Sequence, residues 1–244
     1  MRNKLLIFLR RYPLLYSLIK KIYWQIKSLG ARFWGTKIQE KKWLNRISPE
    51  IQKDFENLDH SHREFLIKEI GNLYPFSDVL EIGCNYGPNL YLLAKRFPQV
   101  NFQGIDINIL SIKQGKQWLN KKNISNVKLY TGKADNLSQF PDKSFDIIFT
   151  DAILIYIGPD KIKKAIKEAI RVARKTIVFL EWYNAFDRGS MGLGDYHFGY
   201  WKRNYINLLK QFVPENQIFL TKLPKEKWQA KDWQEFGYLI EVHL

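Results

Sequence analysis

The stretch VLEIGCNYGPNL, Val79 to Leu90, decides the fold of this chain. It begins as an apolar strand, turns through two glycines and continues into a helix. Glycines at a strand-to-helix turn let a ligand come close to the backbone. Gly83 and Gly87 have the spacing G-x-x-x-G, which differs from the G-x-G-x-x-G that holds a dinucleotide pyrophosphate. The turn therefore predicts a ligand without a pyrophosphate.

Strands and helices alternate through the middle of the chain, which predicts a parallel sheet with helices on both faces. The expected strands are DVLEIG, NFQGIDI, NVKLYTG, SFDIIFTDA and KTIVFLEW. Two later strands, QIFLTKL and FGYLIEVHL, have no long helix between them and are expected to pair antiparallel at the sheet edge. The predicted class is α/β, a Rossmann-like, doubly wound, mostly parallel seven-stranded sheet with an antiparallel edge hairpin and an N-terminal helical extension.

Four carboxylates stand at or after the ends of predicted strands, where open α/β sheets bind their ligands. They are Glu81, Asp106, Asp135 and Asp151. An acid two residues before Gly83 favours a cationic ligand. Asp106 lies at a distance from Gly83 at which a carboxylate binds both hydroxyls of a ribose, and Asp135 is placed to accept from the amine of an adenine. Together they describe a positively charged adenosine without phosphate, which is the chemistry of S-adenosylmethionine.

Four motifs in this order resemble those of the class I S-adenosylmethionine-dependent methyltransferases. They are VLEIGCNYGPNL, GIDI, GKADNL and FDIIFTDAILIYI, and the resemblance covers about residues 70–185. It implies a cofactor site made of Glu81, Gly83, Cys84, Asn85, Gly87, Asp106, Ile107, Ala134, Asp135 and Asp151. The family often has glycine where Asn85 stands. Asparagine adopts positive φ more readily than most residues, so it keeps the turn and adds an amide.

Residues 181–205 are expected to determine which methyl acceptor binds. They form an aromatic, glycine-rich segment after the fifth strand that is predicted to cover the pocket. The candidate substrate residues are Tyr156, Tyr183, His197, Lys202 and Arg203. His197 is either the general base or a packed or surface histidine. Asp151, the second catalytic candidate, either faces the methyl group or caps a turn. Lys202 and Arg203 either hold an acidic acceptor or begin a helix as solvated charges.

The stretch from Asp151 to Asn184 also resembles, more loosely, methylases associated with bacterial surface-sugar (pseudaminic acid) biosynthesis. This resemblance, which the N-terminal segment does not share, implies O-methylation of a sugar or glycan precursor, or of another small hydroxyl acceptor. An N-terminus bound to the membrane would place this reaction at the membrane surface. The Asn/Asp-Pro-Pro-Tyr/Phe signature of DNA N-methylases is absent after the fourth strand. Two alternatives remain open: an RNA methyltransferase, and a non-catalytic family member that only binds the cofactor.

The basic character of the chain is concentrated at its N-terminus. The net charge is +15, and residues 1–46 hold 12 Lys/Arg and one acid, Glu40. We divide the chain into a basic amphipathic helical extension (1–46), a helical connector (47–75) and a methyltransferase domain (76–244). The extension packs on the domain as a lid, lies in an anionic membrane interface, or binds nucleic acid, and the first two are compatible.

Apolar runs, cysteine content and His/Cys spacing predict the cellular compartment and whether the chain binds a structural metal. Apolar runs in the extension are too short for the roughly 20 residues of a membrane span, so we expect a cytoplasmic protein that lies peripherally at the inner membrane surface. The single cysteine, Cys84, forms no disulfide within the chain and is expected to be a small buried residue. No His/Cys cluster has metal-ligand spacing, so we expect no structural metal. The oligomeric state has no signature in the sequence.

We expect Asp106→Ala to weaken S-adenosylmethionine binding by about 1.5–3 kcal/mol, because charge-assisted hydrogen bonds to the ribose are lost. The fold should be unchanged. Isothermal titration calorimetry measures the affinity and circular dichroism the fold. An unchanged affinity would remove Asp106 from the site.

Overall fold

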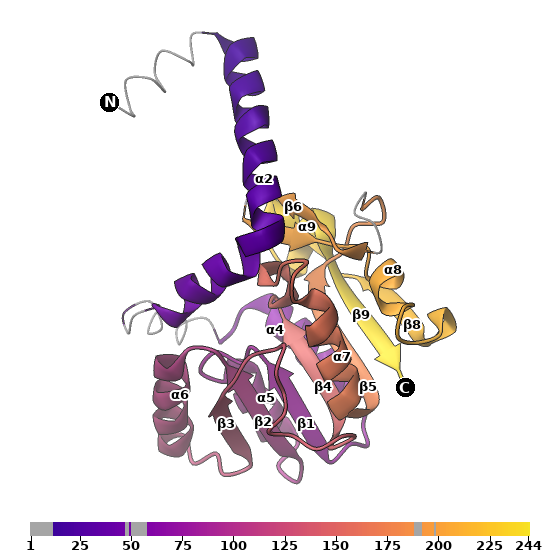
Figure 1. The fold of residues 1–244 in the computed structure, drawn as a ribbon. Helices are drawn as coiled ribbons and strands as arrows, with labels where there is room; N and C mark the ends of the chain where they lie inside the picture. The colour runs from indigo at the N-terminus through magenta and orange to yellow at the C-terminus, as the bar shows by residue number, and fades with distance from the viewer. Residues whose placement is uncertain (1–11, 47–48, 50–57, 188–191, 198) are drawn as a thin grey trace.

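The computed structural model describes residues 12–46, 49, 58–187, 192–197 and 199–244, and a seven-stranded sheet lies at its centre (Figure 1). The strands of this sheet are β1 (Asp78–Ile82), β2 (Asn101–Asp106), β3 (Val127–Thr131), β4 (Phe145–Asp151), β5 (Ala173–Trp182), β8 (Ile218–Lys222) and β9 (Gly237–His243). Their order is β3-β2-β1-β4-β5-β9-β8. Strands β1 to β5 are parallel, and β9 is antiparallel to both β5 and β8. The predicted fold class, with its antiparallel edge pair, is confirmed.

Helices cover both faces of the sheet and bury two hydrophobic cores. The helices of the domain are α4 (Ser61–Asn72), α5 (Pro88–Arg96), α6 (Ile109–Lys121), α7 (Ile162–Val172), α8 (Tyr205–Leu209) and α9 (Lys231–Phe236). One core consists of side chains on one face of the sheet and of α4, α5, α6 and α9. The other consists of side chains on the opposite face and of α7 and α8. Both faces are apolar because side chains alternate along each strand and helices lie on either side.

The described part of the extension forms one long helix, α2 (Pro13–Leu44), with a proline in its first turn, where the missing N–H costs no hydrogen bond. Its first half projects away from the domain and its second half lies against it (Figure 1). In the second half, Thr36 hydrogen-bonds Asp160 at 2.6 Å, and Gln39 donates to the carbonyl of Gly199 at 2.7 Å. Within the described residues, no helix is both long and apolar enough to cross a bilayer.

Two short strands after β5, β6 (Asp195–His197) and β7 (Tyr200–Lys202), pair antiparallel as a separate small sheet. Single turns of 3-10 helix are η1 (Leu154–Tyr156), η3 (Glu215–Gln217) and η4 (Lys225–Lys227). The connector region contains α4, while residues 47–48 and 50–57 lie outside the described part of the chain.

Two buried side chains of opposite charge fix the turn that follows β4. Glu181 accepts from the backbone N–H groups of Ile153 and Leu154, each at 2.9 Å. Arg203 donates to the carbonyl of Leu154 at 2.7 Å and to that of Ile157. Both side chains are fully buried. This corrects the prediction that Arg203 holds an acidic acceptor, because its guanidinium is used to satisfy backbone carbonyls in the core.

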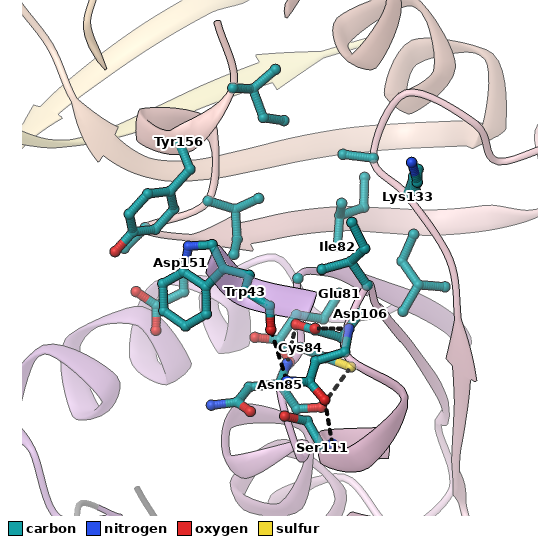
Figure 2. A pocket seen from close by; sticks show the side chains of 18 of the residues that line it. Trp43, Glu81, Ile82, Cys84, Asn85, Asp106, Ser111, Lys133, Asp151 and Tyr156 are labelled. Carbon is teal, nitrogen blue, oxygen red and sulfur yellow. Dashed lines mark hydrogen bonds between the residues drawn. The ribbon is translucent and has the colours of Figure 1, made fainter. Parts of the chain in front are cut away.

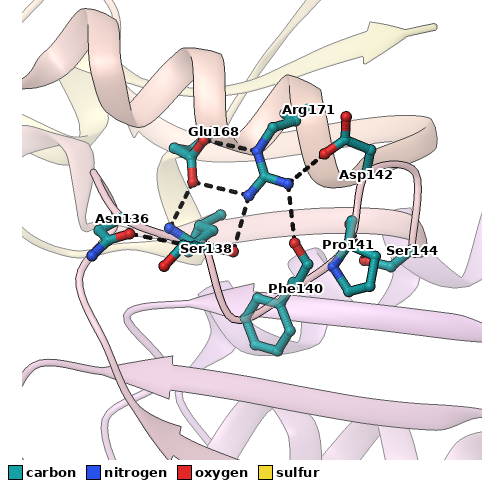
Figure 3. Close-up of polar contacts among 9 residues, drawn as sticks. Asn136, Ser138, Phe140, Pro141, Asp142, Ser144, Glu168 and Arg171 are labelled. Atoms are coloured by element: carbon teal, nitrogen blue, oxygen red, sulfur yellow. Dashed lines mark hydrogen bonds and ion pairs between the residues drawn. The ribbon is translucent and has the colours of Figure 1, made fainter.

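A second arginine fixes the loop between β3 and β4 (Figure 3). Arg171 of α7 donates to the carbonyls of Phe140 and Leu137 and pairs with Asp142 at 2.6 Å. It also pairs with Glu168, which accepts from the backbone N–H of Leu137 at 2.7 Å. Asp135, which lines the ligand site, lies in the same loop two residues before Leu137, so the cluster holds the part of the loop that follows the site.

Candidate active site

A pocket of about 490 Å³ opens beyond the carboxyl ends of β1, β2 and β4 (Figure 2). The structure brings together there nine of the ten predicted cofactor residues, namely Glu81, Gly83, Cys84, Asn85, Asp106, Ile107, Ala134, Asp135 and Asp151. Gly87 does not line the pocket, and instead caps α5 in the left-handed conformation with φ 90°. Cys84 is buried, and burial raises the pKa of its thiol, so the thiol stays protonated.

The glycine turn has the backbone geometry that its sequence requires. Gly83 has φ 80°, and a Cβ placed on it would come within 2.2 Å of the Ile153 side chain. Asn85 has φ 52°, in the left-handed region that asparagine tolerates. Asn85 therefore adopts the left-handed backbone conformation for which a glycine would otherwise be needed.

Asp106 connects this turn to the end of β2. Its carboxylate accepts from the backbone N–H of Asn85 at 2.9 Å and from that of Asn108 at 2.8 Å. Burial raises its pKa, although these hydrogen bonds oppose the change. A carboxylate has about four acceptor positions, so two remain for the hydroxyls of a ribose.

Two further carboxyl groups are bridged by one amide. Asn89, in the first turn of α5, donates to Glu81 Oε1 at 2.7 Å and to Asp151 Oδ2 at 3.0 Å. Arg63 donates to the amide oxygen of Asn89 at 2.6 Å and so fixes its orientation. The other oxygens, Glu81 Oε2 and Asp151 Oδ1, are buried and have no hydrogen-bond partner within the described chain. Since a buried acceptor without a donor is costly, this pair fits a ligand that brings N–H groups.

The two carboxyl groups differ in charge. Burial raises the pKa of Glu81 to about 8, and the neighbouring Asp151 adds to this change. Burial also acts to raise the pKa of Asp151, but His62 and Arg63 beside it hold that pKa well below its usual range. At neutral pH the pair in the free protein therefore carries close to one negative charge, and an ammonium group bound beside it would favour loss of the remaining proton from Glu81.

His60 and His62, which the sequence analysis did not select, form the wall next to Asp151. The Nε2 atom of His62 lies 3.0 Å from Asp151 Oδ2, and its Nδ1 atom lies 2.5 Å from Nδ1 of His60. The His62 ring also stacks on Trp228, with 4.1 Å between ring centroids. In the sequence, these residues could have been found only as a pair of histidines at the start of the amphipathic helix α4. This pair matches no motif.

The roof of the pocket comes from α2 rather than from the predicted segment. Glu40, Trp43 and Arg46 line the pocket, whereas no described residue of 181–205 does. Glu40 pairs with Lys133 at 3.2 Å and with Lys161. The carbonyl of Trp43 accepts from the Asn108 side chain at 2.8 Å. The roof is therefore attached to the loops that follow β2 and β3.

The structure places some of the predicted substrate residues in the pocket lining and others away from it. Tyr156 lines the pocket, with its ring centroid 5.0 Å from that of Trp43. Tyr183 packs on Tyr238, and Lys202 lies over Phe236, both away from the pocket lining. The backbone of His197 pairs with Tyr200 in the hairpin, but its side chain lies outside the described side chains. The predicted role of His197 therefore stays a prediction.

Comparison with known sequences identifies the central domain. Residues 79–176 match the family described as "Methyltransferase domain". These residues form a methyltransferase domain of the class I, S-adenosylmethionine-dependent type. Among the described residues, no group of His, Cys, Asp or Glu is arranged to hold a metal ion.

Curated relatives share part of their length with this chain. An "Uncharacterized protein" of Haemophilus influenzae is 30% identical over 161 residues, which are 66% of this chain and 57% of that protein. A "Fatty-acid O-methyltransferase" of Mycolicibacterium smegmatis is 34% identical over 70 residues, which are 29% of this chain and 24% of that protein. The chain thus spans less than two thirds of either relative.

A solved structure shares the fold across most of the chain. It is geranyl diphosphate C-methyltransferase from Streptomyces coelicolor A3(2), in complex with Mg²⁺, geranyl diphosphate and S-adenosyl-L-homocysteine. It has a TM-score of 0.63 and 13% identity, and the alignment covers 85% of this chain and 97% of that one. At this identity the likeness concerns the fold alone.

S-adenosylmethionine is the cofactor of this domain, and the pocket fits it. Asp106 is placed to hold the ribose, and Ala134 and Asp135 lie where the adenine would bind. The unpartnered oxygens of Glu81 and Asp151 would hold the ammonium group of the methionine part. When bound, the cofactor supplies a methyl group on a sulfonium, and the protein supplies alignment and a water-poor site.

We expect cofactor binding to release about one proton at pH 7, because the ammonium group favours the charged form of Glu81, whose pKa in the free protein is about 8. The affinity should rise as the pH increases towards about 8, since less of Glu81 must then be deprotonated. Calorimetry in buffers of different ionisation enthalpy counts the protons. Glu81→Gln should bind more weakly and release none, and undiminished release in that variant would contradict the assignment.

Proposed function

We propose that this methyltransferase transfers the methyl group to a hydroxyl of a small acceptor, a sugar or glycan precursor, at a membrane surface. The observation that carries the proposal is the aromatic wall of the pocket away from the glycine turn. This wall consists of Trp43 from α2, Tyr156 after β4 and Trp228 after η4. Aromatic faces pack on the C–H faces of sugar rings, and the neighbouring polar groups bind their hydroxyls.

Two facts support oxygen as the acceptor atom. A hydroxyl must lose its proton during methyl transfer, and the same wall carries histidines that suit this step. The Mycolicibacterium relative, similar over 70 residues, is named as an O-methyltransferase.

The projecting half of α2 supports the location at a membrane surface. Seven large apolar side chains are exposed there, namely Tyr12, Leu14, Leu15, Leu18, Ile19, Ile22 and Tyr23. Monomeric soluble proteins rarely expose so much apolar surface in one place. Residues 1–46, which include this half of α2, carry 12 Lys/Arg and one acid, and each basic residue near an anionic surface contributes about 1 kcal/mol of attraction. Insertion of the apolar side chains and attraction of the basic side chains therefore both favour binding to an anionic membrane.

We expect radiolabelled methyl groups from S-adenosylmethionine to enter a cell-envelope fraction and not RNA, because the aromatic wall suits a small ring rather than a polynucleotide. Incubation with a fractionated lysate, followed by base treatment, separates stable ethers from labile esters. Asp106→Ala, incubated in parallel, controls for labelling that does not depend on the cofactor site. Transfer to RNA, or to nitrogen or carbon of the labelled product, would refute the proposal.

We expect the full chain to bind vesicles of phosphatidylserine and phosphatidylcholine, with binding that falls as salt rises. A triple variant, Leu14→Ser, Leu18→Ser and Ile22→Ser, should lose most of this binding. Its matched control is Ile38→Ser, because Ile38 is 62% exposed but lies in the docked half of α2. Flotation measures bound protein. Equal binding by both variants, or none by the wild type at low salt, would contradict the membrane assignment.

A further inference from the structure

We propose that His60 is the general base of methyl transfer and that His62 and Asp151 act on it as positioning residues. This inference rests on the proposed hydroxyl acceptor. Three side chains from two elements form a continuous chain of contacts, Asp151–His62–His60, along the pocket wall. The first two are almost fully buried, and His60 at the end of the chain is partly exposed.

The contacts specify which nitrogen of His60 is available. Two ring nitrogens 2.5 Å apart must share a proton, because two lone pairs at that distance repel each other. In the proposed relay the carboxylate of Asp151 accepts the Nε2–H of His62, and Nδ1 of His62 is the acceptor towards His60. His60 then donates its own Nδ1–H, and its Nε2 atom carries a lone pair. The backbone N–H of His62 approaches Nδ1 of His60 only at 3.4 Å, a much weaker contact.

The Nε2 atom of His60 is free to receive a proton. Within the described chain it has no hydrogen-bond partner. Burial lowers the pKa of His60, the charge of Arg63 lowers it further, and Asp151 opposes them. The remaining neighbour, Trp228, is uncharged and packs with its ring centroid 5.4 Å from that of His60. His60 is therefore neutral near pH 7, as a general base must be.

His60 also lies between two hollows. It lines the main pocket and, with Trp228, a second hollow of about 390 Å³ whose other walls are Asp59, Ser61, Gln229 and Ala230. The proposed acceptor hydroxyl lies on the main-pocket side of His60 and Trp228, and the second hollow lies on their other side. The proton taken up in catalysis thus has a short way out that does not pass the cofactor.

The step balances without another reactant. The acceptor oxygen forms a bond to the methyl carbon as the sulfur–carbon bond breaks, and that electron pair stays on sulfur. The hydroxyl proton goes to Nε2 of His60. The resulting imidazolium is still hydrogen-bonded to His62, and the Asp151 carboxylate at the end of the chain offsets its charge.

Nitrogen NMR of the ¹⁵N-histidine-labelled full chain tests the tautomers without turnover. The chain has four histidines, and His→Gln variants assign them, with His243→Gln on β9, outside the pocket lining, as the control. We expect a protonated Nδ1 and bare Nε2 in His60, and a protonated Nε2 in His62. Asp151→Asn should disturb both patterns. A His60 protonated at Nε2, or a His62 protonated at both nitrogens near pH 7, would overturn the proposal.

Kinetics with an acceptor found by the labelling experiment give the second test. His60→Gln should lower kcat by about 10²–10⁴-fold and leave cofactor affinity nearly unchanged. His62→Gln should lower kcat less and shift the pH–rate profile, because the tautomer of His60 is no longer fixed. A loss of cofactor affinity with unchanged kcat would place His60 in the cofactor site instead. If no hydroxyl compound is methylated, the proposed function fails, while the NMR result still decides whether the relay exists.

Discussion

The amide of Asn89 is the contact on which the rest of the site depends. It is 2% exposed and touches Glu81 at the end of β1, Asp151 at the end of β4 and Arg63 on α4. Two carboxyl groups in a buried site repel each other unless a proton or a donor separates them. The amide supplies that donor and leaves one oxygen of each carboxyl facing the pocket. The ammonium site that we infer follows from this bridge, and the amide adds to the stronger effects of His62 and Arg63 that lower the pKa of Asp151.

The two sides of the pocket come from different parts of the chain. The sheet and its following loops supply the cofactor side, where backbone geometry at Gly83 and Asn85 controls access. In our proposal the acceptor side consists of Tyr156 and of segments outside the matched domain, namely α2, the start of α4 and the residues around Trp228. These added segments would then determine specificity on a common domain. In our proposal the same helix α2 that covers the pocket also reaches the membrane.

The sequence predicted the sheet and the residues around the cofactor because both depend on local patterns. The apolar strand, the two glycines and Asp106 at the next strand end all have fixed spacing within one strand–helix–strand unit. The acceptor side was not predictable in this way. Arg203 looked like a surface charge, yet it is buried because the turn after β4 needs donors for its carbonyls. Trp43 and His60 enter the pocket through packing of helices distant in sequence, which leaves no motif.

The most direct test of the central claim compares two ligands of the Asn89→Leu variant. Leucine keeps the number and branching of the side-chain heavy atoms of Asn89 but removes the amide, so the ammonium site should be lost while the adenosine site remains. Calorimetry should show S-adenosylmethionine binding at least about tenfold more weakly than in the wild type. Binding of 5′-methylthioadenosine, which lacks the amino-acid part, should be nearly unchanged. An equal loss for both ligands, or no loss for either, would contradict the account.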